Sequence, residues 1–460
     1  MRRAPRALTT ALAALVVAAV ATGAAWYRLG PVTRATVWAE DGGIFFRDRL
    51  AFGADGSLFR PYAGYLHLLP RLVVDLGFAR PVDQYAVTVA GACCVVVGVV
   101  AAAVFVLARD LVPAWPLRLV LAAVPVAVPV VPVEISGNAA NLHWFMLLLV
   151  PWVFAARVRS WWGSAVLTLL ALVAVLTEPQ TLLFAPLLVV GWLRTTRGPE
   201  GSRLRALPVS IVTAGAGAAQ VVCALTVPRL SPPGDPTVRD VVHGWLLIVV
   251  PSAWTRQVGT VADAIARHGW WVLVVPLVGM AVLVAAALVV GSWWARVQVL
   301  AFGLGSFVVW TAALVANLEA NGHWGEVAVS TLAGSGSSRY SAASAVLLTS
   351  GVVLAAAVVA DRRSWAGGPR SGTAAAGSVP RVTRAVAGAA AGVLAWGAIA
   401  VVVAAAVTSA VPGVTQRSNG PAWAPQVHAG EPACRADPGV VLQVRTAPWG
   451  TDVPCALVLR

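Results

Sequence analysis

Lysine is absent from this chain, and charged residues of every kind are scarce. All 33 positively charged residues are arginines, and only 11% of the 460 residues are charged. Hydrophobic residues make up 59%, and the mean hydropathy is +0.80. This balance excludes a soluble globular domain and is typical of a polytopic helical membrane protein. Because no basic run is interleaved with aromatic residues, the net charge of +14 does not predict nucleic-acid binding.

Cysteine is also rare, and its positions form no zinc motif. The five cysteines include no C-x-x-C pair and no cluster with histidine. Cys93, Cys94 and Cys223 lie in apolar stretches, where cysteine behaves as a small hydrophobic residue. Cys434 and Cys455 lie in the polar C-terminal region, and they can form a disulfide if that region is outside the cell.

Apolar segments long enough to approach the thickness of a bilayer recur along the chain. We expect an all-α fold with about 11 transmembrane helices, at about 7–30, 85–108, 118–133, 142–156, 163–177, 180–193, 206–227, 270–290, 297–316, 342–360 and 385–409. Several are short for a hydrocarbon core of ~30 Å. Pro125, Pro129 and Pro132 predict kinks in the third helix.

Arginines crowd the connections on one side of these helices, which the positive-inside rule assigns to the cytoplasm. We therefore expect a multi-pass protein of the cytoplasmic membrane, with its N-terminus inside and its C-terminus outside. Residues 1–410 would form the transmembrane domain, in which 31–84 is the first outer loop with an amphipathic segment at 65–78. Residues 411–460 would form a short extracytoplasmic tail held by the disulfide.

Two adjacent acids, Glu40 and Asp41, lie in W-A-E-D-G just beyond the first helix, where we expect the water-exposed edge of the membrane. Neighbouring carboxylates raise each other's pKa or bind a divalent cation. One of them can also act as a general base toward an acceptor hydroxyl. The alternative is an ordinary cap at the start of a helix, where acids are favoured.

The same loop contains Arg60 and Arg71, which are outward arginines against the positive-inside trend. Such arginines predict an anion site, for example for a phosphate. His67 lies between them, close to Tyr62 and Tyr65, and either joins this site or belongs to an interfacial aromatic belt.

A second outer cluster, in E-I-S-G-N-A-A-N-L-H-W, consists of Glu134, Asn138, Asn141, His143 and Trp144. Amides bind hydroxyl groups and an indole stacks on a sugar ring, so the cluster predicts contacts with a carbohydrate. The alternative is a loop with helix caps.

Three further sites lie on the same predicted face. Glu178, in T-E-P-Q, is either a structural acid at a tight turn or a third acid of the outer face. His323 repeats the histidine–tryptophan chemistry of the earlier cluster. Arg339 and Tyr340 open the tenth helix, where the arginine is placed to bind a phosphate.

With these motifs the chain resembles the type C superfamily of integral membrane glycosyltransferases, in particular its multi-spanning actinobacterial members. The resembling stretches are W-A-E-D-G (38–42), G-N-A-A-N-L-H-W (137–144) and S-S-R-Y-S (337–341), within residues 1–410. The resemblance implies transfer of a sugar from a polyprenyl-phosphate donor to an envelope glycan or lipid acceptor on the outer membrane face. It makes Asp41 the general base, with Glu40 beside it.

The chain departs from this family in two ways. It has no W-W-D-type signature, since none of its Trp-Trp pairs precedes an aspartate, and it lacks a large C-terminal carbohydrate-binding domain. The sugar, the acceptor and any need for a divalent metal at Glu40 and Asp41 therefore stay open. The alternatives are a transporter or lipid flippase, which would need ionisable residues near mid-membrane, and a non-catalytic envelope assembly protein.

Overall fold

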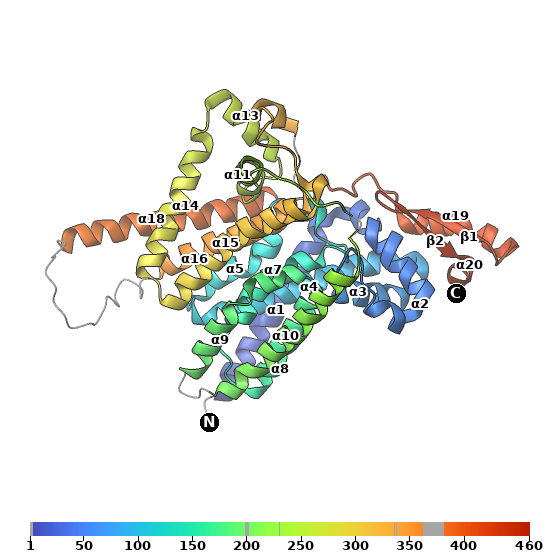
Figure 1. Ribbon diagram of the computed structural model, residues 1–460, viewed down its shortest axis with the longest axis horizontal. Coiled ribbons are helices and arrows are strands. Elements are labelled where there is room, and N and C mark those ends of the chain that lie inside the picture. The colour runs from blue at the N-terminus through green and yellow to red at the C-terminus, as the bar shows by residue number, and fades with distance from the viewer. Residues whose placement is uncertain (1–2, 198–201, 230, 335, 337, 362–380) are drawn as a thin grey trace. The chain divides into compact units, whose positions relative to one another are not determined.

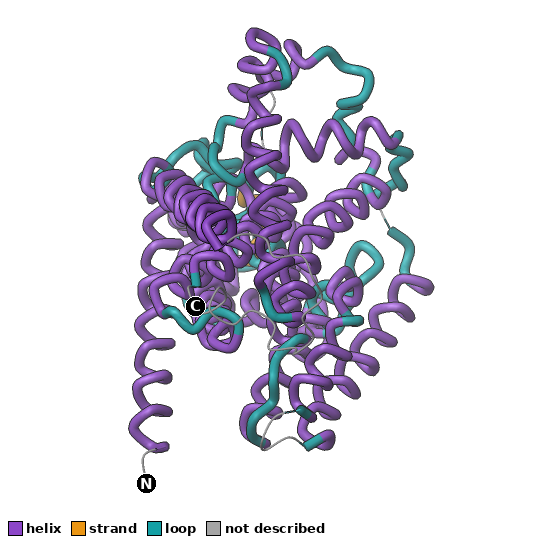
Figure 2. The backbone as a smooth tube through the Cα atoms, turned by 90° about the vertical axis from the view of Figure 1, so that its left-hand side faces the viewer, coloured by secondary structure: helices purple, strands orange, loops and turns teal. Residues whose placement is uncertain are grey.

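The computed structural model describes residues 3–197, 202–229, 231–334, 336, 338–361 and 381–460. In this part the chain is almost wholly helical, with one short β-hairpin (Figure 2). The first half contains α1 (Arg3–Arg34), α2 (Arg47–Leu58), α3 (Leu68–Phe78), α4 (Tyr85–Leu107), α5 (Trp115–Ala127), α6 (Val131–Glu134), α7 (Leu142–Phe154), α8 (Trp161–Val175), α9 (Leu187–Thr196) and α10 (Arg203–Thr226). The second half contains α11 (Val238–Gly244), α12 (Val250–Ser252), α13 (Val258–His268), α14 (Trp271–Val290), α15 (Trp293–Ala316), α16 (Arg339–Ala360), α18 (Arg381–Thr408), α19 (Trp423–Ala436), β1 (Val441–Arg445), β2 (Gly450–Pro454) and α20 (Cys455–Val458).

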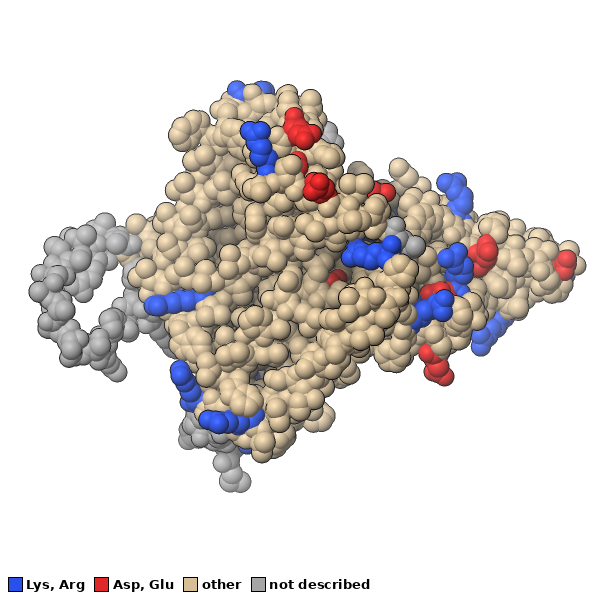
Figure 3. Space-filling view, viewed as in Figure 1, with Lys and Arg blue, Asp and Glu red and all other residues tan. Residues whose placement is uncertain are grey.

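Eight of the described helical segments are long and apolar enough to cross a membrane. They are Leu8–Arg34, Val82–Asp110, Trp115–Glu134, Arg203–Thr226, Trp271–Val290, Trp293–Ala316, Arg339–Ala360 and Gly388–Thr408. The shorter apolar helices α7 and α8 lie at the segments expected at 142–156 and 163–177. α9 overlaps only the second half of the segment expected at 180–193, because Pro179–Phe184 forms a 3₁₀ turn. On the face drawn in Figure 3, the long helices carry few charged side chains. The prediction of a helical, multi-pass membrane protein is thus confirmed.

The third span is broken where its prolines predict a kink. α5 ends at Ala127, and Val128 is extended, with φ −56° and ψ 126°. The residue before a proline avoids the helical region, and Pro129 itself has no N–H to donate. The helix resumes as α6 only at Val131.

The described contacts divide the chain into two compact units. The first comprises residues 1–103, 130–232 and 409–460, and the second comprises 104–129 and 233–408. In the first unit every residue of α7 is buried. In the second, α16 packs against α14, α15 and α18 and is buried from Ser341 to Val359 (Figure 1). Its Ala, Ser and Gly residues suit the close approach of helices in a membrane.

Two stretches that we expected to be outer loops are more helical than expected. The first, 31–84, holds α2 and a π-helical turn, Asp41–Phe46, in addition to α3, which occupies most of the expected amphipathic segment. The stretch from Val238 to His268, which we expected to be a loop, contains α11, α12 and α13.

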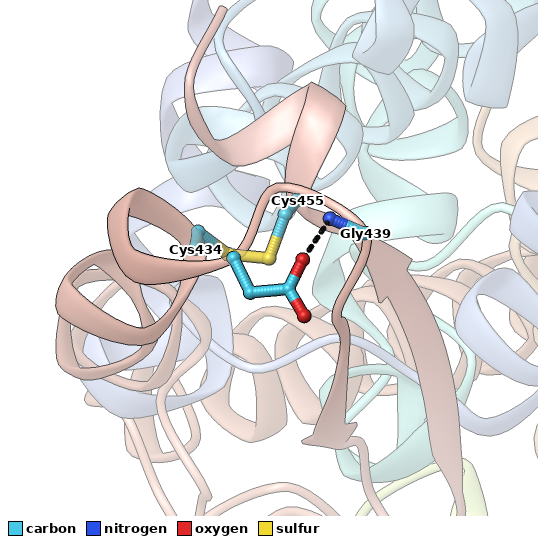
Figure 4. The surroundings of a disulfide bond; sticks show 4 residues. Cys434, Gly439 and Cys455 are labelled. Carbon is cyan, nitrogen blue, oxygen red and sulfur yellow. Dashed lines mark hydrogen bonds between the residues drawn. A yellow bond between two sulfur atoms is a disulfide. The ribbon is translucent and has the colours of Figure 1, made fainter.

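The C-terminal segment forms a small module closed by the predicted disulfide. α19 leads into the antiparallel hairpin β1–β2, and the Cys434–Cys455 bond joins the end of α19 to the start of α20 (Figure 4). Beside the bond, the amide of Gly439 donates to Oδ1 of Asp437 at 2.8 Å. Both cysteines are fully buried. The disulfide prediction is therefore confirmed.

Removal of this bond should destabilise the module. A disulfide that closes a loop of about this size contributes ~3 kcal/mol, chiefly by restricting the unfolded chain. We expect the double variant Cys434→Ser/Cys455→Ser to unfold at a lower temperature than the native protein. Cys223→Ser, which removes a free thiol, is the control. Equal unfolding midpoints for the double variant and the native protein would contradict a stabilising role.

Candidate functional site

The Asp41 carboxylate joins the first outer loop to the start of α7. Its Oδ2 accepts the amide N–H of Ala139 and its Oδ1 that of Ala140, both at 2.8 Å. Asp41 is only 1% exposed, so the expectation that it lies at a water-exposed edge is wrong. Asp41 does begin a helical turn, as the helix-cap alternative expected. Its carboxylate, however, accepts amides at the positive N-terminal end of a different helix, α7.

Burial dominates the electrostatics of this carboxyl group. Removal from water raises the pKa of Asp41 to about 7, although the amides of Ala139 and Ala140 and the positive charge of Arg417 lower it. The negative charge of Glu40 raises it further. A carboxyl group with this pKa exchanges protons near neutral pH, which is the requirement for a general base.

Two amide N–H groups take up part of the acceptor capacity of Asp41, one on each carboxylate oxygen. Among the described residues, no group of three or more His, Cys, Asp or Glu side chains could hold a metal ion. The divalent cation considered at Glu40 and Asp41 therefore gains no support.

The amides of Asn138 and Asn141 build the loop that supplies the N–H groups. Asn138 Nδ2 donates to the Glu134 carbonyl at 2.6 Å, and its Oδ1 accepts the Asn141 amide at 3.0 Å. Asn141 Oδ1 in turn accepts Nε1 of Trp144 at 3.1 Å. Asn138, Asn141 and Trp144 are all buried. These contacts favour the alternative of a capped loop over direct contact with a carbohydrate.

His67 lies in an aromatic cluster formed by the first outer loop. Its ring centroid is 4.0 Å from that of Tyr65, 5.4 Å from that of Phe45 and 5.6 Å from that of Tyr62. Burial holds the pKa of His67 well below its usual value, and the nearby charges of His143 and Arg71 lower it further. His67 is therefore a neutral imidazole at physiological pH.

Arg71 and Arg60 flank one carboxylate. Arg71 Nη2 donates to Asp48 Oδ2 at 2.9 Å, and Arg60 Nε lies 3.6 Å from Asp48 Oδ1. Arg71 is 2% exposed, and its Nε and Nη1 have no hydrogen-bond partner among the described residues. Burial lowers the pKa of its guanidinium, which the adjacent Asp48 opposes. A buried guanidinium with unused donors is suited to an anion.

The polar ends of α8 and α10 hold this loop in place. The first amides of α3, those of Leu68 and Leu69, donate to the Leu176 carbonyl at 3.2 Å and to Thr177 Oγ1 at 3.1 Å. Gln220 of α10 accepts the Leu66 amide at 2.9 Å. Backbone donors at the start of a helix need such partners, because the helix itself offers none.

Glu178 and His143 connect this cluster to the start of α7. The two side chains form a close hydrogen bond between Oε2 of Glu178 and Nδ1 of His143, and both are buried. Glu178 Oε1 also accepts the Gln180 amide at 2.8 Å, which caps the 3₁₀ turn Pro179–Phe184. The His143 ring lies 4.1 Å from that of Trp144. Glu178 thus has the structural role considered for it and is also paired with a candidate site residue.

The first unit gathers most of the predicted site from four separate stretches. Its members are Glu40, Asp41, Arg60, His67, Arg71, Glu134, Asn138, Asn141, His143, Trp144 and Glu178. His323, Arg339 and Tyr340 belong to the second unit. There Arg339 contacts Tyr340, with Nη2 3.4 Å from the hydroxyl, and Ser338 caps α16. Ser337 of the S-S-R-Y-S motif lies outside the described residues.

The sequence did not reveal that the C-terminal tail is part of this site. Arg417 donates to the carbonyls of Ser136 at 2.6 Å, Gly137 at 2.9 Å and Thr36 at 3.2 Å. Under the proposed topology it is an outward arginine, and the criterion that selected Arg60 and Arg71 would have found it as well.

The hairpin of the tail rests directly on the acidic motif. Thr451 Oγ1 donates to the Gly42 carbonyl at 2.8 Å. A Cβ at Gly42 would lie 2.6 Å from Thr446 Cγ2, and one at Gly43 would lie 2.8 Å from Trp449 Cε3. The two glycines that follow Asp41 therefore permit this close approach.

Comparisons with known proteins do not identify a family. No family model, no curated protein and no solved structure matches this chain. The likeness to type C glycosyltransferases stays a prediction from the motifs.

The raised pKa of Asp41 makes stability depend on pH. Between about pH 4 and pH 7 the folded protein keeps a proton that the unfolded chain releases, so stability falls as the pH rises through this range. We expect Asp41→Asn to remove this contribution, measured as the change in unfolding midpoint between pH 5 and pH 7.5. Asp75→Asn, which removes an acid paired with Arg49, should keep it. The same pH dependence in Asp41→Asn and the native protein would contradict the assignment.

Proposed function

We propose that the protein is a glycosyltransferase that moves a sugar from a polyprenyl-phosphate donor to an envelope glycan or lipid acceptor. The observation that carries the proposal is a buried carboxyl group with a pKa of about 7, Asp41, in the same unit as the arginine-containing cluster of Arg60 and Arg71. A proton acceptor and a site for a leaving phosphate are the two groups that this reaction needs.

In the proposed mechanism, Asp41 accepts the proton of an acceptor hydroxyl. The hydroxyl oxygen then attacks the anomeric carbon of the donor sugar, and the bond from that carbon to the phosphate oxygen breaks with inversion. The polyprenyl phosphate leaves as an anion, which Arg60 and Arg71 stabilise.

The contacts of Asp41 leave it able to accept a proton. An ionised carboxylate has about four acceptor positions, and the amides of Ala139 and Ala140 use two of them. Glu40 is half-buried and more exposed than Asp41. Glu40 is therefore the second candidate base, and variants of the two acids separate the roles.

Asp41→Asn should lower turnover roughly 10²–10⁴-fold, because an amide cannot accept the proton. It should also destabilise the protein by about 1–3 kcal/mol, since the Asn NH₂ group faces an amide N–H that loses its acceptor. Transfer is measured in proteoliposomes with a purified lipid-linked donor, per amount of folded protein. Glu40→Gln should have the smaller effect, and Asp75→Asn is the control. Near-normal turnover in Asp41→Asn would exclude it as the base.

The rival classes receive less support. A transporter or flippase needs ionisable residues near the middle of its spans. α16, which is buried throughout, has no ionisable side chain between Tyr340 and Asp361. A non-catalytic assembly protein would show no transfer in the same assay even in its native form, so the assay decides this alternative.

We further propose that the protein lies in the cytoplasmic membrane, with its N-terminus inside and its C-terminal module outside. Because Asp41 and Cys434 are buried, accessibility is best tested at the exposed positions Asp437 and Arg159. A membrane-impermeant thiol reagent should label Asp437→Cys in intact cells and should label Arg159→Cys only after the membrane is opened. Labelling of position 159 but not 437 from outside would reverse the topology.

A further inference from the structure

The loop that begins α7 is held from both sides by opposite charges. Asp41 accepts the amides of Ala139 and Ala140, as described above. Arg417 donates to the carbonyls of Ser136 and Gly137, which precede Ala139 and Ala140 in the same loop. Its guanidinium is 3% exposed, and its bonds run to backbone that carries no net charge. The loop therefore separates a buried cation from a buried carboxyl group.

Arg417 also ties this loop to the segment that precedes Asp41. Its Nη1 donates to the Thr36 carbonyl at 3.2 Å as well as to Gly137 at 2.9 Å. One rigid, planar side chain thus binds both backbone segments that the Asp41 contact joins: the segment before Asp41 and the loop before α7. Gly137 has φ 69°, and a Cβ there would lie 3.3 Å from Arg417 Nη2 and 2.4 Å from Leu29 Cδ1. The glycine allows the loop to turn under the guanidinium.

The tail backbone around Arg417 is itself anchored. The Arg417 amide donates to Thr415 Oγ1 at 3.1 Å, and that hydroxyl lies 2.7 Å from Thr33 Oγ1. The amide of Gln416 donates to the Val133 carbonyl at 2.8 Å. A few residues on, the Trp423 amide donates to Ala35 at 2.8 Å. The backbone on both sides of Arg417 is therefore fixed by its own hydrogen bonds, and the position of Arg417 does not depend on its side chain alone.

We propose that Arg417 is a positioning residue for Asp41: it holds the 136–140 loop so that the Asp41 carboxylate keeps the geometry in which it accepts the proton. This inference rests on the proposed function, because it assigns Arg417 a part in the same reaction. It also gives the C-terminal tail a role in the site, since Arg417 lies in the stretch that leads into α19.

The charged and titratable groups that face Asp41 determine how its titration should respond to the loss of Arg417. Arg417 contributes a positive charge and Glu40 a negative one. Tyr85 donates its hydroxyl to the Asp41 carbonyl at 2.8 Å, and the Cys93 thiol lies close enough to interact with the carboxylate. Loss of the positive charge at 417 leaves Glu40 unopposed, so the midpoint of the acid limb of the pH–rate profile should rise.

The test compares Arg417→Gln, Arg417→Lys and Arg435→Gln in proteoliposomes with a lipid-linked sugar donor. Arg435 lies in α19 of the C-terminal module and is exposed. Among the described residues it pairs only with Glu431, which makes it the matched control. Two readouts are taken: the pH dependence of kcat/KM, and hydrogen exchange of the amides of Ala139 and Ala140.

We expect Arg417→Gln to lower kcat/KM at pH 7 by roughly 10²-fold, the effect of misplacing a catalytic group by about 1 Å. Its pH midpoint should rise by about one unit. Arg417→Lys keeps the charge but loses the planar fork, so its midpoint should stay and its kcat/KM should fall about tenfold. Both Arg417 variants should lose protection of the two amides, whereas Arg435→Gln should match the native protein.

Native protection of Ala139 and Ala140 together with a native pH midpoint in Arg417→Gln would overturn the proposal. If Arg417→Gln does not fold, native protection in Arg417→Lys would overturn it as well. Absence of transfer by the native protein would refute the proposed function instead, and the exchange measurement would still decide whether Arg417 positions the loop.

Discussion

The structure of the candidate site depends on one buried carboxyl group. Asp41 begins the π-helical turn after α1 and binds the two amides that precede α7, so that one side chain fixes segments about 100 residues apart in the sequence. A carboxylate in this position is favoured by the N-terminal end of the helix and opposed by burial. The balance raises the pKa of Asp41 to about 7. The contact that orders the site thus lowers the pKa of Asp41, and burial raises it to a value near neutral pH.

The remaining site residues divide into two kinds. Asn138, Asn141 and Trp144 use their polar atoms on one another and on the backbone, and they maintain the shape of the loop. Arg71 keeps donors that the described protein does not use, and Arg60 is half-exposed beside it. Only the second kind is available to a ligand, and for this reason the proposed phosphate site is placed at the arginines and not at the asparagines.

Local sequence patterns predicted the spans but not the packing around the site. Apolar length and the proline-rich stretch around Pro129 were enough to place the eight long apolar segments and the break in the third. The segment expected at 180–193 was only half right, since its α-helix begins at Leu187. The disulfide followed from two cysteines in a polar tail. The contacts of Arg417 could not be found in this way, because they join residues 280 and 381 positions apart. Burial of Asp41 was missed for the same reason, since its cover comes partly from the distant tail.

The most direct test of the account is the lipid and glycan content of cells that lack this protein. The account predicts that a deletion strain accumulates a polyprenyl-phosphate sugar and loses that sugar from an envelope glycan or lipid. The native gene should reverse both changes, and a gene encoding Asp41→Asn, expressed at a similar level, should reverse neither. An unchanged pool of polyprenyl-phosphate sugars in the deletion strain, or full reversal by Asp41→Asn, would contradict it.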